Sequence, residues 1–148
     1  MPDTREARPI VLVVDDEPAV VQLLVRMLAP GGYQILTATC GKGALAVSAA
    51  SPRPIDLLLT DLHMPEMNGR TLATEMRRTQ LGMKVVYLTA HCDDLFGELT
   101  LLEPHEAFIE KPISPTGVRE AVALHLYGTL TPVAGAAPAA GLLRRTAS

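Results

Sequence analysis

Five short apolar runs alternate along the chain with segments that have the residue spacing of a helix. The apolar runs cover residues 10–14, 34–38, 55–60, 85–89 and 107–109. Helical segments are expected at residues 18–28, 41–50, 69–78, 93–102 and from 114 onward. Parallel strands need crossover connections, and helices supply them. The alternation therefore predicts an α/β fold in which a doubly wound, five-stranded parallel sheet carries helices on both faces.

The first helix has the clearest apolar pattern. Its inward face is predicted to consist of the residues spaced i, i+3, i+4, i+7 and i+8, namely Val20, Leu23, Leu24, Met27 and Leu28. Val21 and Val25 would then project toward a different side of the helix. We hypothesise that these two valines form a docking surface for a kinase. Contact with a neighbouring helix is the alternative explanation.

Length and composition fit one folded domain with short extensions. The chain has 148 residues, of which 48% are hydrophobic, so it can bury a core of its own. We expect a disordered N-terminus at residues 1–8 and a folded domain at residues 9–128. Residues 129–148 are rich in proline, alanine and glycine and show no periodicity, which predicts a flexible tail.

Composition also argues against several classes of function. The net charge of −3 and the lack of a run rich in lysine or arginine argue against binding to nucleic acid. The N-terminus has no apolar signal-peptide core, and the apolar runs are too short to cross a bilayer. Cys40 and Cys92 stand far apart, outside any metal-binding motif, and are predicted to be reduced thiols. The sequence therefore predicts a cytoplasmic protein that binds neither nucleic acid nor membrane.

Polar residues follow or end four of the five apolar runs. Asp15 and Asp16 follow the first run, Asp61 follows the third, Thr89 ends the fourth and Lys111 follows the fifth. Because the carboxyl ends of parallel strands meet at one edge of a sheet, these side chains should converge there. Clustered carboxylates repel each other unless a cation lies among them. A hard divalent ion, Mg²⁺ (or Mn²⁺), meets that need.

Asp61 is the best candidate for the reactive group at this edge. It is the lone acid after its run, whereas Asp15 and Asp16 have the arrangement of a metal-binding pair. A carboxylate held beside a metal ion, a lysine and a hydroxyl group is placed to attack phosphorus and form an aspartyl phosphate. The predicted chemistry is therefore the transfer of a phosphoryl group to Asp61.

Four motifs carry these polar residues, in the order VVDDEP, TDLHMPEMNG, VVYLTAH and AFIEKP. In this order and spacing they resemble the receiver domain of two-component response regulators, the CheY-like superfamily. The resemblance covers residues 8 to 127, nearly all of the expected folded part. It implies a flavodoxin-like (βα)5 receiver fold and a phosphoacceptor, rather than an enzyme that turns over a substrate.

The resemblance also implies a role for each residue at the predicted site. Asp61 would accept the phosphoryl group. Asp15, Asp16 and the backbone carbonyl of His63 would hold Mg²⁺ together with Asp61. The ammonium group of Lys111 would contact a phosphoryl oxygen.

A conformational switch is implied in the same way. The hydroxyl group of Thr89 would be drawn toward the phosphoryl group, and Phe108 would then turn inward into the vacated space. The peptide bond between Lys111 and Pro112 would be cis. The resemblance thus implies that phosphorylation shifts the domain between two conformations.

The partners implied by the resemblance are proteins. The phosphodonor would be a phosphohistidine on a sensor histidine kinase or on a histidine phosphotransfer protein. The signal would pass through protein contacts to an unknown downstream protein, and a homodimer is a further candidate assembly. Because no output domain follows in this sequence, we expect a single-domain regulator or a phosphorelay component.

Two other functions compete with this interpretation. A haloacid-dehalogenase-type phosphohydrolase also uses Mg²⁺ on a parallel sheet, but its nucleophile follows the first strand in a D-x-D motif, whereas Asp15 and Asp16 are adjacent. The second competitor is a binding module that keeps the fold without being phosphorylated. Taken singly, the residues also have ordinary explanations: Asp15 and Asp16 could begin a helix in solvent, and Asp61 could form a turn.

Two histidines lie close to the predicted site in the sequence. His63 and His91 each stand two residues after a site residue, Asp61 and Thr89 respectively. We hypothesise that they flank the mouth of the site and tune the lifetime of the phosphoryl group, since histidine changes charge near neutral pH. Two solvated loop side chains are the alternative.

Overall fold

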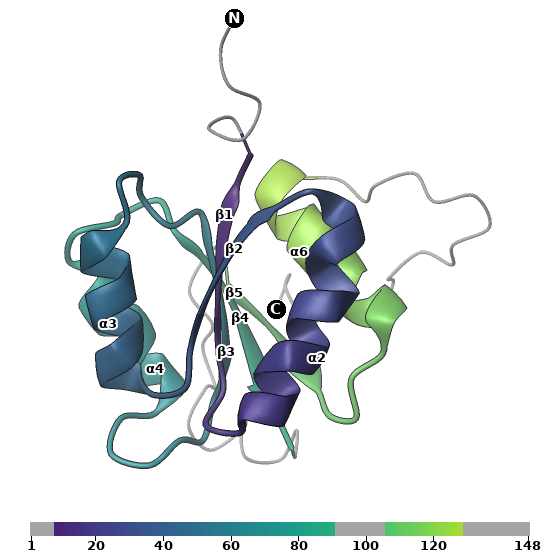
Figure 1. Cartoon of the computed structure of the whole chain (residues 1–148), viewed down its shortest axis with the longest axis horizontal. Coiled ribbons are helices and arrows are strands. Elements are labelled where there is room, and N and C mark those ends of the chain that lie inside the picture. Colours follow the sequence, from purple (N-terminus) through teal and green to yellow (C-terminus); the bar gives the residue numbers. More distant parts are fainter. Residues whose placement is uncertain (1–7, 91–105, 129–148) are drawn as a thin grey trace, which may run out of the picture.

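A five-stranded parallel sheet forms the centre of the computed structural model, which describes residues 8–90 and 106–128 (Figure 1). The strands are β1 (Ile10–Val14), β2 (Gln34–Ala38), β3 (Leu57–Asp61), β4 (Lys84–Thr89) and β5 (Glu106–Glu110). Their order across the sheet is β2-β1-β3-β4-β5, and every neighbouring pair is parallel. The predicted five-stranded parallel sheet is thus confirmed.

Helices cover both faces of this sheet. They are α2 (Pro18–Leu28), which the 3₁₀ turn η1 (Ala29–Gly31) follows, α3 (Gly41–Ala50), α4 (Gly69–Arg77) and α6 (Pro115–Tyr127). Figure 1 shows α3 and α4 on one face and α2 and α6 on the other, so the sheet is doubly wound. The strand order reverses beside β1. In open parallel sheets, this switch point opens a crevice at the carboxyl ends of the strands.

Two apolar layers hold the helices against the sheet. Alternate side chains of a strand point to opposite faces. On β1, Ile10, Leu12 and Val14 pack on the side of α3 and α4, while Val11 and Val13 pack on the side of α2 and α6. All five are completely buried. Burial on both faces explains why this strand is a continuous apolar run rather than an alternation of apolar and polar residues.

The inward face of α2 differs from the predicted one. Val21 is 6% exposed and belongs to the core, and Val25 packs partly against that core. Leu23, which the spacing placed inward, is 42% exposed. The prediction was wrong because apolar residues surround much of this helix, so that packing against the sheet and α6, not spacing, fixes its rotation. Because Val21 is buried, the hypothesis that Val21 and Val25 form an exposed docking surface fails.

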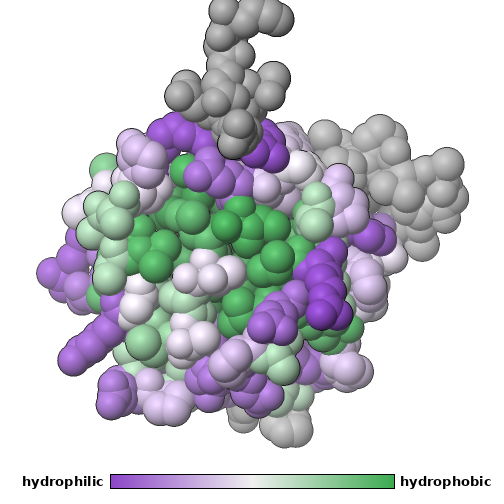
Figure 2. Space-filling view, viewed as in Figure 1, coloured by the Kyte–Doolittle hydropathy of each residue, from purple (hydrophilic) through white to green (hydrophobic). Residues whose placement is uncertain are grey.

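β2 is an edge strand, and most of its side chains are only half buried. Figure 2 shows an apolar surface over this strand, between α3 and α2. A shallow pocket of about 250 Å³ lies between β2 and α3 and is lined by Gln34, Leu36, Val47, Ala50, Ser51 and Pro52.

Several sequence predictions concern residues that the structure does not describe. The helix predicted at residues 93–102 lies outside the described residues, as do His91, Cys92 and the segments 1–7 and 129–148. Cys40 is described: its exposed thiol stands at the start of α3. Within residues 8–90 and 106–128, no helix is long and apolar enough to span a bilayer.

Candidate functional site

Three carboxylates converge where β1 and β3 end. Asp15 follows β1 directly, Asp16 is the next residue, and Asp61 is the last residue of β3. Carboxylate oxygens of the three side chains lie within 4.8 Å of one another. Asp15 is completely buried and Asp61 is 7% exposed, whereas Asp16 faces solvent. Because β1 and β3 are parallel neighbours, their ends bring together acids that are far apart in the sequence.

Lys111 reaches this group of acids from the end of β5. Its Nζ lies 3.5 Å from Oδ2 of Asp15 and 3.7 Å from Oδ1 of Asp61. The backbone N–H of Lys111 donates to the carbonyl oxygen of Thr89 at 2.7 Å, which continues the pairing of β4 and β5 as far as the lysine. The following peptide bond, Lys111–Pro112, is cis. The ammonium group is thus held between carboxylates from two other strands.

Asp15 fixes one carboxylate oxygen in a local turn and turns the other toward the lysine. Oδ1 accepts a hydrogen bond from the backbone N–H of Glu17 at 2.9 Å. Oδ2 is buried and accepts no hydrogen bond from the described residues, although the Lys111 ammonium lies at ion-pair distance. Burial raises the pKa of Asp15, while the Glu17 N–H and Lys111 oppose that rise. A buried oxygen in this condition is one that a bound ligand would complete.

Burial and the neighbouring charges also change the pKa of Asp61. Its pKa is raised to about 6, chiefly because burial disfavours the charged form. The charges of Asp15 and Asp16 act in the same direction, whereas Lys111 and a hydrogen bond from the backbone N–H of His63 favour the carboxylate. A pKa of about 6 leaves most of this carboxyl group ionised at neutral pH.

The loop after Asp61 shows why the chain turns there. Leu62 is buried and anchors the loop, and Asn68 caps α4 by accepting a hydrogen bond from the backbone N–H of Thr71 at 2.8 Å. Gly69 then begins α4 directly against the backbone of Asp61, where a Cβ atom would collide with the Asp61 carbonyl oxygen. The Asn-Gly pair therefore serves as a helix cap and a close contact, which together tie the start of α4 to the site.

The remaining predicted residues occupy the neighbouring strands. Thr89 ends β4 and is completely buried. Phe108, on β5, packs partly buried against the core layer beneath α3 and α4 and lies opposite Tyr87 in the strand register. The side chain of His63 is exposed, which fits both a residue at the mouth of a site and a solvated loop side chain.

The charges of the site fit a hard divalent cation. Three acidic side chains share this place with one basic side chain, Lys111, so acidic groups outnumber basic ones within a few ångströms. Mg²⁺ prefers carboxylate and carbonyl oxygens and retains several waters, so it suits a partly exposed group of this kind. The buried Oδ2 of Asp15, which accepts no hydrogen bond from the described residues, is an oxygen on which such an ion could be held.

A parallel sheet of order 2-1-3-4-5 with acids gathered at its switch point defines a flavodoxin-like α/β domain. The family model described as the response regulator receiver domain matches residues 11–123. The chain therefore belongs to the response regulator receiver family, and the resemblance seen in its four motifs is confirmed.

Two curated relatives illustrate the similarity in sequence. The chain is 35% identical over 104 residues to the response regulator SaeR of Staphylococcus epidermidis, and 33% identical over 111 residues to the transcriptional regulatory protein GlrR of Escherichia coli. These matches cover 70% and 75% of this chain, but 44% and 24% of the two relatives. The chain thus spans less than half the length of either protein.

Solved structures show the same similarity in three dimensions. The response regulator TrrA from Thermotoga maritima, in complex with Mg²⁺ and BeF, superposes with a TM-score of 0.69 and 31% identity, covering 80% of this chain and 99% of that one. The receiver domain of the hybrid histidine kinase CckA gives a TM-score of 0.63 and 32% identity, covering 79% and 98% respectively. Both proteins match this chain over nearly their whole length.

One buried acid was missed by the sequence analysis. Glu106 begins β5 and is only 4% exposed, but it lies just before the apolar run predicted at residues 107–109. An acid beside a short run is ordinarily read as solvent-exposed. No local signal indicates its burial, because its partners come from β4 and α4.

Proposed function

We propose that this chain accepts a phosphoryl group on Asp61 from a phosphohistidine donor, in a reaction that depends on Mg²⁺. One observation carries the proposal: the carboxylates of Asp15, Asp16 and Asp61 lie together with the Lys111 ammonium between them. Neither a turn nor a solvated helix start requires acids from two strands to share a lysine from a third.

The metal would be held by oxygen atoms that the site already gathers. The carboxylates of Asp15, Asp16 and Asp61 and the backbone carbonyl of His63 would be its protein ligands, as in the receiver domains that the sequence resembles. A bound Mg²⁺ (or Mn²⁺) would supply positive charge to the phosphoryl oxygens. The excess of negative charge at the site supports this assignment.

The transfer itself is a nucleophilic substitution at phosphorus. A carboxylate oxygen of Asp61 forms the new P–O bond while the P–N bond to the donor imidazole breaks, and the electron pair of that bond returns to the imidazole nitrogen. Lys111, whose Nζ is 3.7 Å from Asp61 Oδ1, would pair with a phosphoryl oxygen. Thr89 would donate its hydroxyl hydrogen bond to another phosphoryl oxygen, and Phe108 would turn inward as Thr89 moves.

The partners of this reaction follow from the family. We propose a sensor histidine kinase or a histidine phosphotransfer protein as donor, and a downstream protein that reads the changed surface. A cytoplasmic location, a role in two-component signalling or a phosphorelay, and a homodimer belong to the same proposal. In this role the chain is a phosphoacceptor and not an enzyme that turns over a substrate.

Intact-mass spectrometry after incubation with acetyl phosphate and Mg²⁺ tests the proposal. We expect the wild type to gain one phosphoryl group, and EDTA or Asp61→Ala to abolish the gain. Glu75→Gln, which removes an acid from the surface of α4, is the matched control and should still be phosphorylated. A wild type that gains no mass, or an Asp61→Ala variant that still gains it, would contradict the proposal.

Turnover of a phosphomonoester distinguishes the proposed phosphoacceptor from the competing phosphohydrolase. If the chain hydrolysed a generic phosphomonoester, and Asp15→Asn abolished that turnover while Asp61→Asn did not, the first-strand acid would be the nucleophile. We expect no such turnover.

A further inference from the structure

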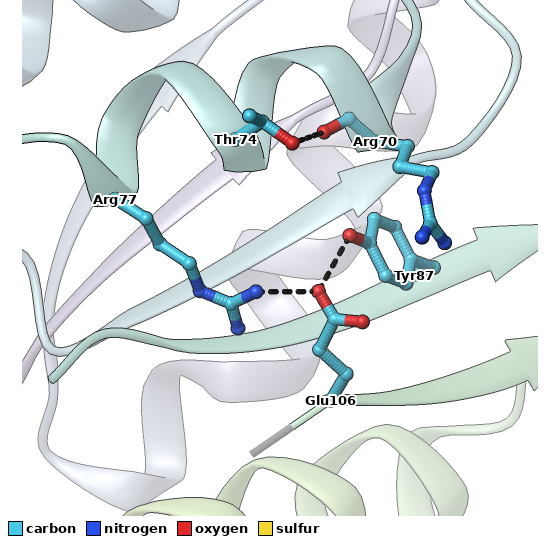
Figure 3. A network of polar contacts seen from close by, with 5 residues as sticks. All are labelled: Arg70, Thr74, Arg77, Tyr87 and Glu106. Carbon is cyan, nitrogen blue, oxygen red and sulfur yellow. Dashed lines mark hydrogen bonds and ion pairs between the residues drawn. The ribbon is translucent and has the colours of Figure 1, made fainter. Parts of the chain in front are cut away.

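Strands β4 and β5 and helix α4 are joined by a network of polar side chains that is largely buried (Figure 3). At its centre is Glu106, the first residue of β5, which is 4% exposed. Its Oε2 accepts a hydrogen bond from the hydroxyl of Tyr87 at 2.9 Å and another from Nη1 of Arg77 at 2.7 Å. The network therefore joins β5, β4 and the last residue of α4.

Tyr87 is a hydrogen-bond donor in this network. Burial, and then the Glu106 carboxylate, raise the pKa of Tyr87, so that the phenol remains protonated and acts as a donor. The ion pair with Arg77 compensates the buried charge of Glu106, which would otherwise be costly. The Tyr87 hydroxyl thus donates to a carboxylate oxygen that is also ion-paired with Arg77, and a hydrogen bond to such an acceptor is stronger than one between neutral groups.

The network lies on the same face of the sheet as the two residues of the proposed switch. Tyr87 precedes Thr89 by two residues on β4, and Glu106 precedes Phe108 by two residues on β5, so each pair points to one side. The register pairs Tyr87 directly with Phe108, and Val85 with Glu106. Tyr87 and Phe108 both pack in the core layer beneath α3 and α4.

The direction of the Tyr87 ring follows from these positions. Its hydroxyl is bonded to Glu106, which lies beside Val85, so the ring leans toward the start of β5 (Figure 3). The opposite direction along β4 leads to Thr89. A ring released from Glu106 would be able to swing toward Thr89 and crowd the place where Phe108 must turn inward.

We infer that Glu106 is a positioning residue for the phosphorylation switch: by holding the hydroxyl of Tyr87, it keeps the space beside Thr89 open for Phe108. The inference rests on the proposed function, and it assigns a role to residues outside the phosphoryl site. The network of Glu106, Tyr87 and Arg77 is connected to the site through three elements. Helix α4 begins against Asp61 and ends at Arg77. Strand β4 carries Tyr87 and ends at Thr89, and β5 begins at Glu106 and leads to Lys111.

Removing the Tyr87 hydroxyl while keeping the ring is the sharpest test. Tyr87→Phe should weaken the binding of beryllofluoride with Mg²⁺ about fivefold, the factor that one hydrogen bond is worth. Tyr127→Phe, which removes a hydroxyl from a half-exposed tyrosine on α6, is the matched control and should leave the affinity unchanged. Glu106→Gln keeps an acceptor oxygen for the Tyr87 hydroxyl but loses the ion pair with Arg77, so it should lose less affinity than Glu106→Leu, which should behave like Tyr87→Phe.

Phe108 itself supplies a second readout. The chain has two phenylalanines, Phe96 and Phe108, so ¹⁹F NMR of fluorophenylalanine-labelled protein gives two signals, and Phe96→Leu identifies them. In the wild type we expect the Phe108 signal to shift on addition of beryllofluoride. Tyr87→Phe adds a third phenylalanine, whose signal is the one absent from the wild type. In this variant a smaller fraction of the Phe108 signal should shift at saturation.

The outcomes are distinguishable. If Tyr87→Phe binds beryllofluoride as tightly as the wild type, or more tightly, and its Phe108 signal responds fully, the inference is wrong even if the variant melts at a lower temperature. A purely structural role would lower the melting temperature alone. If the wild type is not phosphorylated on Asp61 by acetyl phosphate, the proposed function fails and the inference fails with it.

Discussion

Replacing Asp61 by asparagine should stabilise the protein at neutral pH when no metal is present. Asp61 is 7% exposed and lies among like charges. Its pKa is raised from 3.8 to about 6, chiefly by burial, with Lys111 opposing. Each pKa unit corresponds to about 1.4 kcal/mol, so keeping this side chain ionised in the folded protein costs up to about 3 kcal/mol. Asparagine has nearly the same shape and no charge, so Asp61→Asn should recover much of this free energy.

The pH dependence has a definite sign. The pKa of Asp61 is higher in the folded chain than in the unfolded chain, so the folded chain binds the proton of Asp61 more tightly between about pH 4 and pH 6. The free energy of unfolding of the wild type should therefore increase as the pH falls through this window, and the penalty should be fully present above it. Asp61→Asn should show a weaker dependence, of which a part remains because burial also raises the pKa of Asp15.

Urea unfolding in EDTA, followed by circular dichroism at about pH 7 and about pH 5, measures both effects. Glu75→Gln is the control, because its ion pair with Arg78 is on the surface and should be worth less than about 1 kcal/mol. An Asp61→Asn protein that is no more stable than the wild type at about pH 7 would refute the reasoning.

Three further outcomes are expected. Adding Mg²⁺ at neutral pH should raise the urea midpoint of the wild type by an amount that grows with concentration, and Asp16→Asn should reduce this gain; an equal gain in both would exclude Asp16 as a ligand. Lys111→Ala should slow phosphorylation by acetyl phosphate about a hundredfold in a quench-and-mass time course, because the cation 3.7 Å from Asp61 is lost; an unchanged rate would contradict this role. Gly69→Ala should lower the free energy of unfolding by about 1–3 kcal/mol, since its Cβ would meet the Asp61 backbone; Gly82→Ala, whose Cβ would enter open space, is the control, and equal effects would disprove the contact.

Much of the site could be predicted because it depends on local sequence and topology. Asp15, Asp16 and Asp61 each follow a recognisable apolar run, and a parallel sheet places the ends of such runs at one edge. The same rule placed Lys111 there. The roles of these residues in phosphorylation, and those of Thr89 and Phe108 in a switch, stay predictions for the experiments above.

Other features were beyond the reach of the sequence for a physical reason. The pattern on α2 contained apolar residues on several sides, so spacing placed Leu23 inward although it is 42% exposed, and left out Val21, which is buried. Nothing in the local sequence marks Glu106 as buried. Its burial depends on Tyr87 and Arg77, which stand 19 and 29 residues away in the sequence.

The sequence by itself determined the alternation of strands and helices, and with it the edge at which the charged residues gather, because strand period, crossover length and strand-end position are properties of short segments. The tertiary structure alone decided which face of α2 is buried and which groups satisfy Glu106. It also decided how close Lys111 comes to each carboxylate. These depend on packing between distant segments, where shape and charge are matched in space and leave no periodic trace along the chain.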